Sequence, residues 1–586
     1  MTIDPTPLAA PDAGALAVLV STRAVLPCAD DSLVISPATI VLSPLTGKIV
    51  SVVPSIIPED LFPLGTLYTD HSPRLLLPGL VDAHVHLNEP GRTEWEGFWT
   101  GTRAAASGGV TTVVDMPLNA IPPTTTLFGF QEKLRASRGQ CWVDVAFYGG
   151  VIPGNAHELG ALVDAGVRGF KCFLIDSGVE EFPAVSSEDV ALAMCTLKDK
   201  PTTLMFHAEM TPTEGPPALT EADGRDVATY QTFLDSRPPV YETRAVDEIL
   251  SLAHTAPSLH LHIVHLSATQ CIPMLRDARS RGINVTAETC FHYLGLSAED
   301  IARGDTRHKC CPPIRESSNR DRLWDELVAG DSCITTVVSD HSPCTPELKL
   351  LPRQLKAKEE STSNHSKGHS AKKSINGISH ADSATNAKEI KANGIAIASD
   401  RPAINGIVNT SCNGTVAPEL KVLPDHLSKA AEGDGTGVDI TTAVPSGTVP
   451  AGDFMAAWGG ISSVGLGLSI MHTAAKQRSK AGAAPDMTDI VRLCCQATAQ
   501  QVGLAHRKGA LKVGMDADVC VYDDADVWTL DQGSMRWKNR CSPWQGHQFA
   551  GRVCETWLRG RKVYELGSGF AVQEPFGETI TEPRTA

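Results

Sequence analysis

His84 and His86 follow an apolar run, Leu75 to Val81, and are separated by a single residue. On a β-strand, residues i and i+2 point to the same face, so both imidazoles can reach one point. Neutral imidazole is the commonest metal ligand among protein side chains. The spacing therefore indicates half of a metal site, although two ordinary surface or core histidines would share it in a chain with 19 His.

Four more ionisable side chains lie in or at the end of other apolar runs. In chain order they are Lys171 in 169–174, His207 after 204–206, His265 at the end of 260–265 and Asp340 after 335–339. Taken singly, each has an ordinary explanation, namely a core histidine, a lysine that reaches solvent or a helix-capping aspartate. Taken together and in this order, they predict one shared site with the donor types of a metal centre.

The strands and helices that must bring these side chains together are predicted from the pattern of apolar and polar residues along the chain. From Leu76 onward, apolar strands alternate with helix-sized segments, seven or eight times over about 250 residues, which favours a closed (β/α)₈ barrel of the α/β class. In such a barrel the C-terminal ends of the strands converge on one mouth, where catalytic groups lie. The β-branched texture before residue 76 and after about 505 predicts a small flanking β-sandwich built from both chain ends.

One long segment does not fit this pattern. Between Cys344 and Gly452 there is no Phe, Tyr or Trp, and Pro346–Pro352 recurs almost unchanged as Pro418–Pro424. Such a stretch cannot bury enough apolar surface to offset its ordering entropy. We expect a disordered insertion that is either a solvated excursion without effect on catalysis, an error in the predicted coding sequence, or a mobile lid or tether at the mouth. The expected division is 1–76, 77–345 with 452–505, 346–451, and 506–586.

The composition restricts the classes of partner and compartment. The formal net charge of −16 over 586 residues argues against nucleic acid and against an anionic membrane surface. There is no apolar run long enough for a membrane span and no basic secretory n-region. The 16 cysteines form no CxxC pair and are typical of reduced thiols in a cytosol-like compartment. We therefore expect a cytoplasmic protein.

These motifs resemble the amidohydrolase superfamily, specifically its cyclic amidase branch of hydantoinases, dihydroorotases and allantoinases. The resemblance runs from about Pro78 to Asp340, resumes at Gly452–Ser463 and includes 509–518. It implies a binuclear centre with two Zn²⁺ per subunit and carbon dioxide bound as a lysine carbamate. The implied ligands are His84 and His86 for the first metal, His207 and His265 for the second, carboxylated Lys171 (N6-carboxylysine) as the bridge, and Asp340 on the first metal.

The chemistry requires these residue types. A lysine ammonium has no lone pair for a metal, whereas burial favours the amine, which can react with carbon dioxide to form a bridging anion. Two metals would lower the pKa of a shared hydroxide and polarise the scissile carbonyl. Asp340 would be the catalytic residue that takes the proton and delivers it to the leaving ring nitrogen. The donors suit zinc, although cobalt, manganese and iron accept the same set.

Residues near the ligands indicate which ring is opened. Dihydroorotases have HxHLR, in which the arginine reaches the substrate carboxylate, and Asn88 stands at that position here. Motifs at 115–119, 288–293, 309–315 and 457–463 resemble allantoinases more closely than hydantoinases. The resemblance implies hydrolysis of allantoin, a small neutral cyclic ureide, to allantoate. The implied substrate contacts are Asn88, Cys290, Tyr293, Trp458 and Gly459 with Gly460.

Two other functions stay open. The first is a dihydropyrimidinase or hydantoinase, which shares the ligand set. The second is a non-catalytic scaffold on the same barrel, but such relatives typically lose metal ligands, and all six positions are filled here. Relatives of this branch are commonly homotetramers or homodimers, which is the oligomeric state we expect. The chain departs from the branch in its long insertion and at Val464–Gly467.

Overall fold

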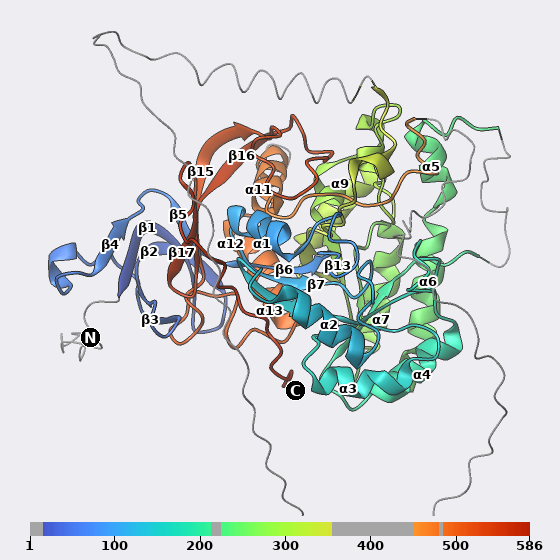
Figure 1. The fold of residues 1–586 in the computed structure, drawn as a ribbon, viewed down its shortest axis with the longest axis horizontal. Coiled ribbons are helices and arrows are strands. Elements are labelled where there is room, and N and C mark those ends of the chain that lie inside the picture. The colour runs from blue at the N-terminus through green and yellow to red at the C-terminus, as the bar shows by residue number, and fades with distance from the viewer. Residues whose placement is uncertain (1–15, 213–223, 354, 356–450, 480–483, 586) are drawn as a thin grey trace, which may run out of the picture. The chain divides into compact units, whose positions relative to one another are not determined.

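A parallel barrel forms the centre of the fold in the computed structural model, which describes residues 16–212, 224–353, 355, 451–479 and 484–585 (Figure 1). Almost every strand residue is buried, which explains why these strands are continuous apolar runs. The barrel strands are β6 (Leu80–Val85), β7 (Val110–Asp115), β8 (Asp144–Phe147) with β9 (Gly149–Gly150), β10 (Phe170–Phe173), β11 (Thr203–His207), β12 (His260–Ile263), β13 (Val285–Cys290) and β14 (Ile334–Val338).

The strands are paired in sequence order into two arcs, β6 to β8 and β9 to β14. Only Tyr148 separates β8 from β9, so these two form one barrel strand with an irregularity. On the other side, Val85 forms a parallel bridge with His341, and the His86 amide donates to the His341 carbonyl at 2.8 Å. The expected (β/α)₈ barrel is confirmed, with β14 adjacent to β6.

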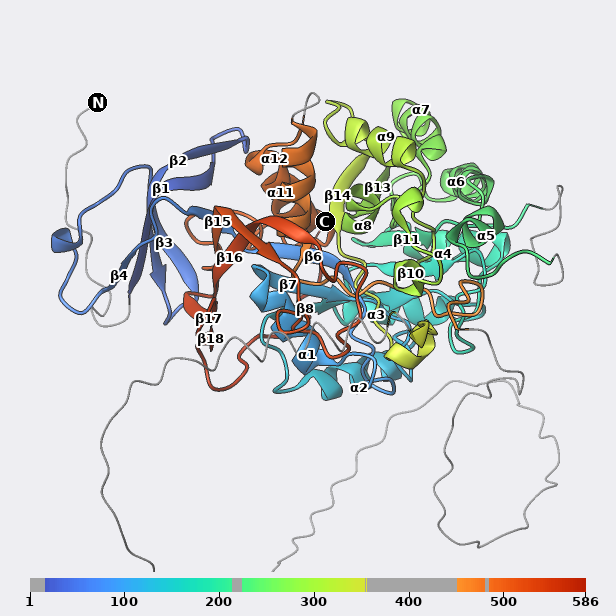
Figure 2. The same cartoon turned by 90° about the horizontal axis from the view of Figure 1, so that it is seen from above.

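Helices alternate with the barrel strands and cover them on the outside (Figure 2). Ser186 begins one of them with a capping box to Asp189, which satisfies free amides of the first turn. The helices are α1 (Phe98–Ser107), α2 (Leu127–Ser137), α3 (Leu159–Asp164), α4 (Ser187–Leu197), α5 (Tyr230–Ser236), α6 (Val240–Leu252), α7 (Ile272–Ser280), α8 (Phe291–Gly295), α9 (Ser317–Leu327), α11 (Gly467–Arg478), α12 (Met487–Val491) and α13 (Ala497–Gln501).

Both chain ends contribute to one small β domain, as expected. We expected a sandwich, and the strands of this domain are hydrogen-bonded to one another as a single nine-stranded sheet. The two ends meet where β5 pairs antiparallel with β15, with Leu77 opposite Cys520. The strands are β1 (Ala17–Pro27), β2 (Leu33–Ser43), β3 (Lys48–Val53), β4 (Leu67–Asp70), β5 (Leu75–Pro78), β15 (Val519–Thr529), β16 (Gln548–Leu558), β17 (Arg561–Glu565) and β18 (Gly569–Phe570).

Buried ion pairs and the C-terminal tail join this domain to the barrel. The Lys508 ammonium lies 2.6 Å from Asp144 at the start of β8 and 2.7 Å from Asp518. The tail then runs beside β8, where the Ile580 amide donates to the Val145 carbonyl at 2.8 Å. The C-terminal tail comes after the last strand of the small sheet in the sequence, and it packs against the barrel.

The first residues of the expected insertion belong to the folded part of the chain. Pro346–Lys349 form a 3₁₀ turn (η8), and both Lys349 and Leu351 are buried. Both side chains are packed inside the folded part of the chain, whereas the low aromatic content of the whole segment had predicted disorder. Most of the expected insertion, 356–450, lies outside the described residues. Within the described ranges, no helix combines the length and apolar character needed to cross a membrane.

Candidate metal centre

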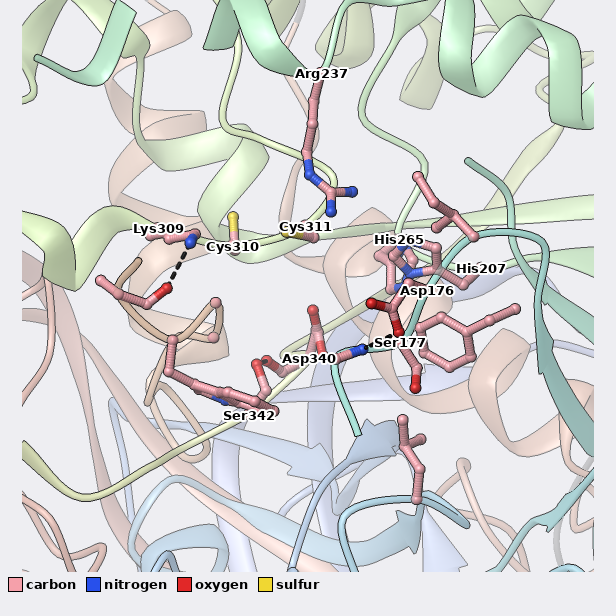
Figure 3. A pocket seen from close by; sticks show the side chains of 18 of the residues that line it. Asp176, Ser177, His207, Arg237, His265, Lys309, Cys310, Cys311, Asp340 and Ser342 are labelled. Carbon is pink, nitrogen blue, oxygen red and sulfur yellow. Dashed lines mark hydrogen bonds between the residues drawn. The ribbon is translucent and has the colours of Figure 1, made fainter. Parts of the chain in front are cut away.

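All six predicted ligands converge toward the C-terminal ends of the barrel strands. Figure 3 shows three of them, His207, His265 and Asp340, facing the same cavity. Each is at most 7% exposed. His265 and Asp340 lie just beyond β12 and β14 with φ of 38° and 43°, in the left-handed region that residues with side chains seldom adopt. Such backbone strain persists where the surrounding structure imposes it, often at functional sites. Here it turns both side chains toward the centre.

The first group of ligands consists of His84, His86 and Asp340. The Asp340 Oδ1 atom lies 3.4 Å from His84 Nε2 and 3.6 Å from His86 Nε2. His84 Nε2 is buried and has no hydrogen-bond partner. A buried imidazole nitrogen without a partner, facing a carboxylate and a second imidazole, fits a metal ligand.

The second group of ligands consists of Lys171, His207 and His265. The His265 Nε2 atom lies 3.1 Å from His207 Nδ1 and 3.3 Å from Lys171 Nζ. Burial lowers the pKa of His207 to about 4 and that of His265 well below its ordinary value, so both imidazoles are neutral as ligands must be. Burial likewise lowers the pKa of Lys171 to about 8, which raises its fraction of free amine.

Two buried glutamates orient the histidines and were not identified from the sequence. Glu288 Oε1 accepts from His84 Nδ1 at 2.5 Å, which leaves His84 Nε2 free for a metal. Glu209 Oε2 accepts from His207 Nε2 at 2.8 Å, which leaves Nδ1 free. A carboxylate behind a ligating histidine fixes its tautomer and ring orientation. Two features of the sequence could have identified the two glutamates. Glu288 lies inside a buried strand, and Glu209 lies two positions after the predicted ligand His207.

The two glutamates differ in their other contacts. Glu288 Oε2 also accepts from His262 at 3.1 Å and from the Gln501 amide at 3.3 Å. Although burial acts in the opposite direction, the contacts with His84 and His262 hold the pKa of Glu288 well below its usual range. Glu209 instead forms an ion pair with Arg237 at 2.6 Å.

A cavity of about 450 Å³ opens onto the ligands. Trp458, Gly459 and Gly460 line it, where the predicted substrate contacts require them. Its wall also includes residues that the sequence did not assign to the site, among them Phe173, Asp176, Ser177, Arg237, Lys309 and Cys311 (Figure 3). The volume is large enough for a small cyclic molecule beside the ligands.

Three of the predicted substrate contacts do not line this cavity. Tyr293 is buried, and its hydroxyl donates to the Pro312 carbonyl at 2.7 Å, so it supports the neighbouring loop. Asn88 is buried, and its amide lies 3.4 Å from the Pro343 carbonyl. Cys290 is fully buried beneath the site. Asn88 and Tyr293 follow a barrel strand and Cys290 ends one, but the direction of each side chain depends on local turns that sequence spacing does not reveal.

Asn119 is a cavity residue at the end of the turn after β7. Its side-chain amide lies 3.4 Å from His86 Nδ1, and its φ is 67°. The Arg92 guanidinium donates to the Asn119 carbonyl at 2.8 Å. Asn119 therefore contacts the Nδ1 side of His86, as an amide rather than as an accepting carboxylate.

Among the described residues, two further groups have metal-ligand spacing. Cys290, His292 and Asp340 share a carboxylate with the centre already described. Asp144, Asp516 and Glu578 form the other group. The Lys508 ammonium lies 2.6 Å from Asp144 and 2.9 Å from Asp516, so those carboxylates belong to ion pairs.

Comparison with known proteins agrees with this arrangement. A family model described as "Amidohydrolase family" matches residues 75–563. A Saccharomyces cerevisiae protein named allantoinase is 40% identical over 94% of this chain and 96% of its own length. A Streptomyces avermitilis allantoinase is 34% identical over 96% and 98%. The L-hydantoinase (dihydropyrimidinase) structure from Arthrobacter aurescens has a TM-score of 0.70 at 22% identity, covering 96% of this chain and 99% of that one.

Proposed function

Because the chain belongs to the amidohydrolase family, we propose that it hydrolyses the cyclic amide bond of the hydantoin ring of allantoin to give allantoate. The observation that carries the proposal is the convergence of all six ligands beside a cavity, in a chain whose full-length relatives are named allantoinases. The class of the reaction follows from the ligands. The substrate follows from the similarity along the whole chain.

Two divalent metals, zinc first among them, are part of this proposal. His84, His86 and Asp340 would hold one, His207 and His265 the other, and carboxylated Lys171 would bridge them. The unpartnered, buried Nε2 atom of His84 and the lowered pKa of Lys171, about 8, support the assignment. When bound, the metals activate water as the nucleophile and polarise the scissile carbonyl.

The chain's own residues orient the reactants and move the proton. Burial raises the pKa of Asp340 above the ordinary range of a carboxyl group, which suits a group that must gain and lose a proton. Asp340 would take the proton of the attacking water and deliver it to the ring nitrogen as the amide bond breaks. Trp458, Gly459 and Gly460 form the cavity wall against which the neutral ring would lie.

Turnover assays on allantoin, dihydrouracil and dihydroorotate, each with a chelator control, test the substrate. We expect chelator-sensitive opening of allantoin only. Opening of dihydrouracil with allantoin inert would favour a dihydropyrimidinase, the activity for which the similar Arthrobacter aurescens protein is named. Elemental analysis of the purified protein should find close to two metal ions per chain, and none would favour the non-catalytic scaffold.

Compartment and assembly are also proposals. We infer a cytoplasmic protein from its scattered cysteines, and one that binds neither nucleic acid nor membranes from its net charge of −16. By analogy with relatives of the family, we infer a homodimer or homotetramer. Light scattering of the purified protein measures the oligomer directly, and a mass of one chain would contradict the expectation.

A further inference from the structure

Lys349 is a buried lysine behind the Trp458–Gly460 wall of the cavity. It is 4% exposed, and its ammonium donates to the carbonyls of Trp458 at 3.1 Å, Lys309 at 3.4 Å and Gly460. The three carbonyls match the three donors of an ammonium group. Across the described ranges of the chain, no carboxylate lies within ion-pair distance of it. A buried charge without a counterion is costly, so the main chain around Lys349 must be arranged to solvate it.

Main-chain contacts join the same two segments. The Trp458 amide donates to the Leu348 carbonyl at 2.9 Å, and the Gly452 amide donates to the Leu350 carbonyl at 2.5 Å. Leu350 has a φ of 51°, a left-handed conformation that a leucine adopts only under constraint. A Cβ atom added to Gly452 would lie 3.0 Å from the Pro352 Cγ, so the two segments are closely packed against each other.

The two joined segments flank residues 356–450 in the sequence. Closing a loop costs conformational entropy that grows with the number of residues in it. Lys349 and Trp458 lie 109 positions apart in the sequence. The contacts between their segments must therefore offset a larger cost than contacts between segments that a short connection joins. Lys349 is the only described side chain of 346–352 that donates hydrogen bonds to carbonyls in the cavity wall.

We propose that Lys349 is a positioning residue that clips the two flanks of 356–450 together and so holds the Trp458–Gly460 wall of the cavity. The clip makes catalysis independent of the intervening residues. For its activity readout the inference rests on the proposed function, because the wall is where the ring would bind. The proposal predicts that loss of the Lys349 hydrogen bonds raises KM more when the connection between the two flanks is long than when it is short.

Four proteins test this inference: the full chain, its Lys349→Met variant, a deletion that joins Leu355 to Ala451, and the deletion carrying Lys349→Met. In the full chain, Lys349→Met should raise KM for allantoin about 10- to 100-fold, with kcat and metal content nearly unchanged, because the wall moves while the ligands stay. The deletion alone should match the full chain. In the deletion, Lys349→Met should change KM by less than about threefold, since a short loop closes at little cost.

Lys512→Met, which removes an exposed lysine of the small domain, is the matched control and should leave KM unchanged. Equal KM effects of Lys349→Met in both backgrounds would overturn the coupling to loop length. A fall in kcat and metal content without a change in KM would reduce Lys349 to a general stabilising role.

A second measurement does not depend on turnover. Amide hydrogen exchange in peptides covering 451–461 should speed up at least about tenfold in full-length Lys349→Met, because the amides of Gly452, Trp458 and Gly460 lose their fixed partners. Unchanged exchange there would overturn the clip even if the deletion variant fails to fold. If the full chain does not open allantoin, the proposed function fails, while this measurement still tests Lys349.

Discussion

In both halves of the proposed metal centre, a buried glutamate accepts a hydrogen bond from a histidine, but the two glutamates have different surroundings. Behind His84, Glu288 is buried in the barrel interior, where its described hydrogen-bond partners are the imidazoles of His84 and His262, the Gln501 amide and the His265 backbone amide. Behind His207, Glu209 is paired with Arg237, whose guanidinium reaches the catalytic cavity. The His84 half is therefore isolated from the cavity, whereas the His207 half is connected to it through the ion pair of Glu209 and Arg237.

The difference indicates a division of labour between the halves. A carboxylate without a counter-cation interacts fully with a ligating imidazole and with the metal beyond it. A carboxylate shared with a guanidinium gives part of its charge to that partner. We therefore expect the His84 half to determine metal retention and the His207 half to respond to what occupies the cavity.

Lys171→Ala should have the largest effect, because both halves depend on the bridging group. We expect activity to fall by at least about 1,000-fold, since metal activation of water contributes several kcal/mol. Metal per chain after dialysis and turnover on allantoin measure this. Adding propionate should restore part of both by filling the vacated place with a carboxylate. Full metal loading in the variant without rescue would remove Lys171 from the centre.

Glu288→Gln should weaken metal binding by about 100-fold, the upper end for a group behind a ligand. The amide cannot replace a carboxylate that accepts from two imidazoles. Competition with a graded chelator measures the affinity. Glu326→Gln is the control, since Glu326 is also buried but pairs with Arg276 at 2.6 Å, away from the centre. An equal loss in the control would mean that burial alone explains the effect.

Glu209→Gln should weaken metal binding by only about tenfold, the lower end of the same range. The amide oxygen can still accept from His207, and the freed Arg237 is 23% exposed, so water can solvate it. The same chelator titration gives the comparison. A loss of metal affinity equal to or larger than that of Glu288→Gln would contradict the proposed difference between the His84 and His207 halves.

Arg237→Met should not weaken metal binding, because Glu209 keeps its bond to His207, and should act on the substrate instead. We expect KM for allantoin to rise about tenfold, as for the loss of one hydrogen bond from a charged donor. Steady-state kinetics with a metal assay separate the two quantities, and Arg237→Lys should recover part of the loss. Release of metal at unchanged KM would assign Arg237 to the ligands alone.

Much of the barrel could be predicted from local patterns. The apolar runs 169–174 and 204–206 correspond to β10 and β11, because a strand buried on both faces must be a continuous apolar run. The positions of Asn88 and Tyr293 could not be predicted in the same way. Whether a side chain after a strand enters the cavity or the core depends on turns such as the left-handed one at Asn88.

The sequence by itself predicted the identity and order of the six proposed ligands, because they lie in or just beyond five apolar strands and parallel strands end at one mouth. Only the tertiary structure decided what stands behind them. Glu288 meets His84 across 204 positions, and Lys349 meets Trp458 across 109. Such contacts depend on barrel closure and on how distant loops pack, and no local periodicity encodes which distant side chain will be the partner.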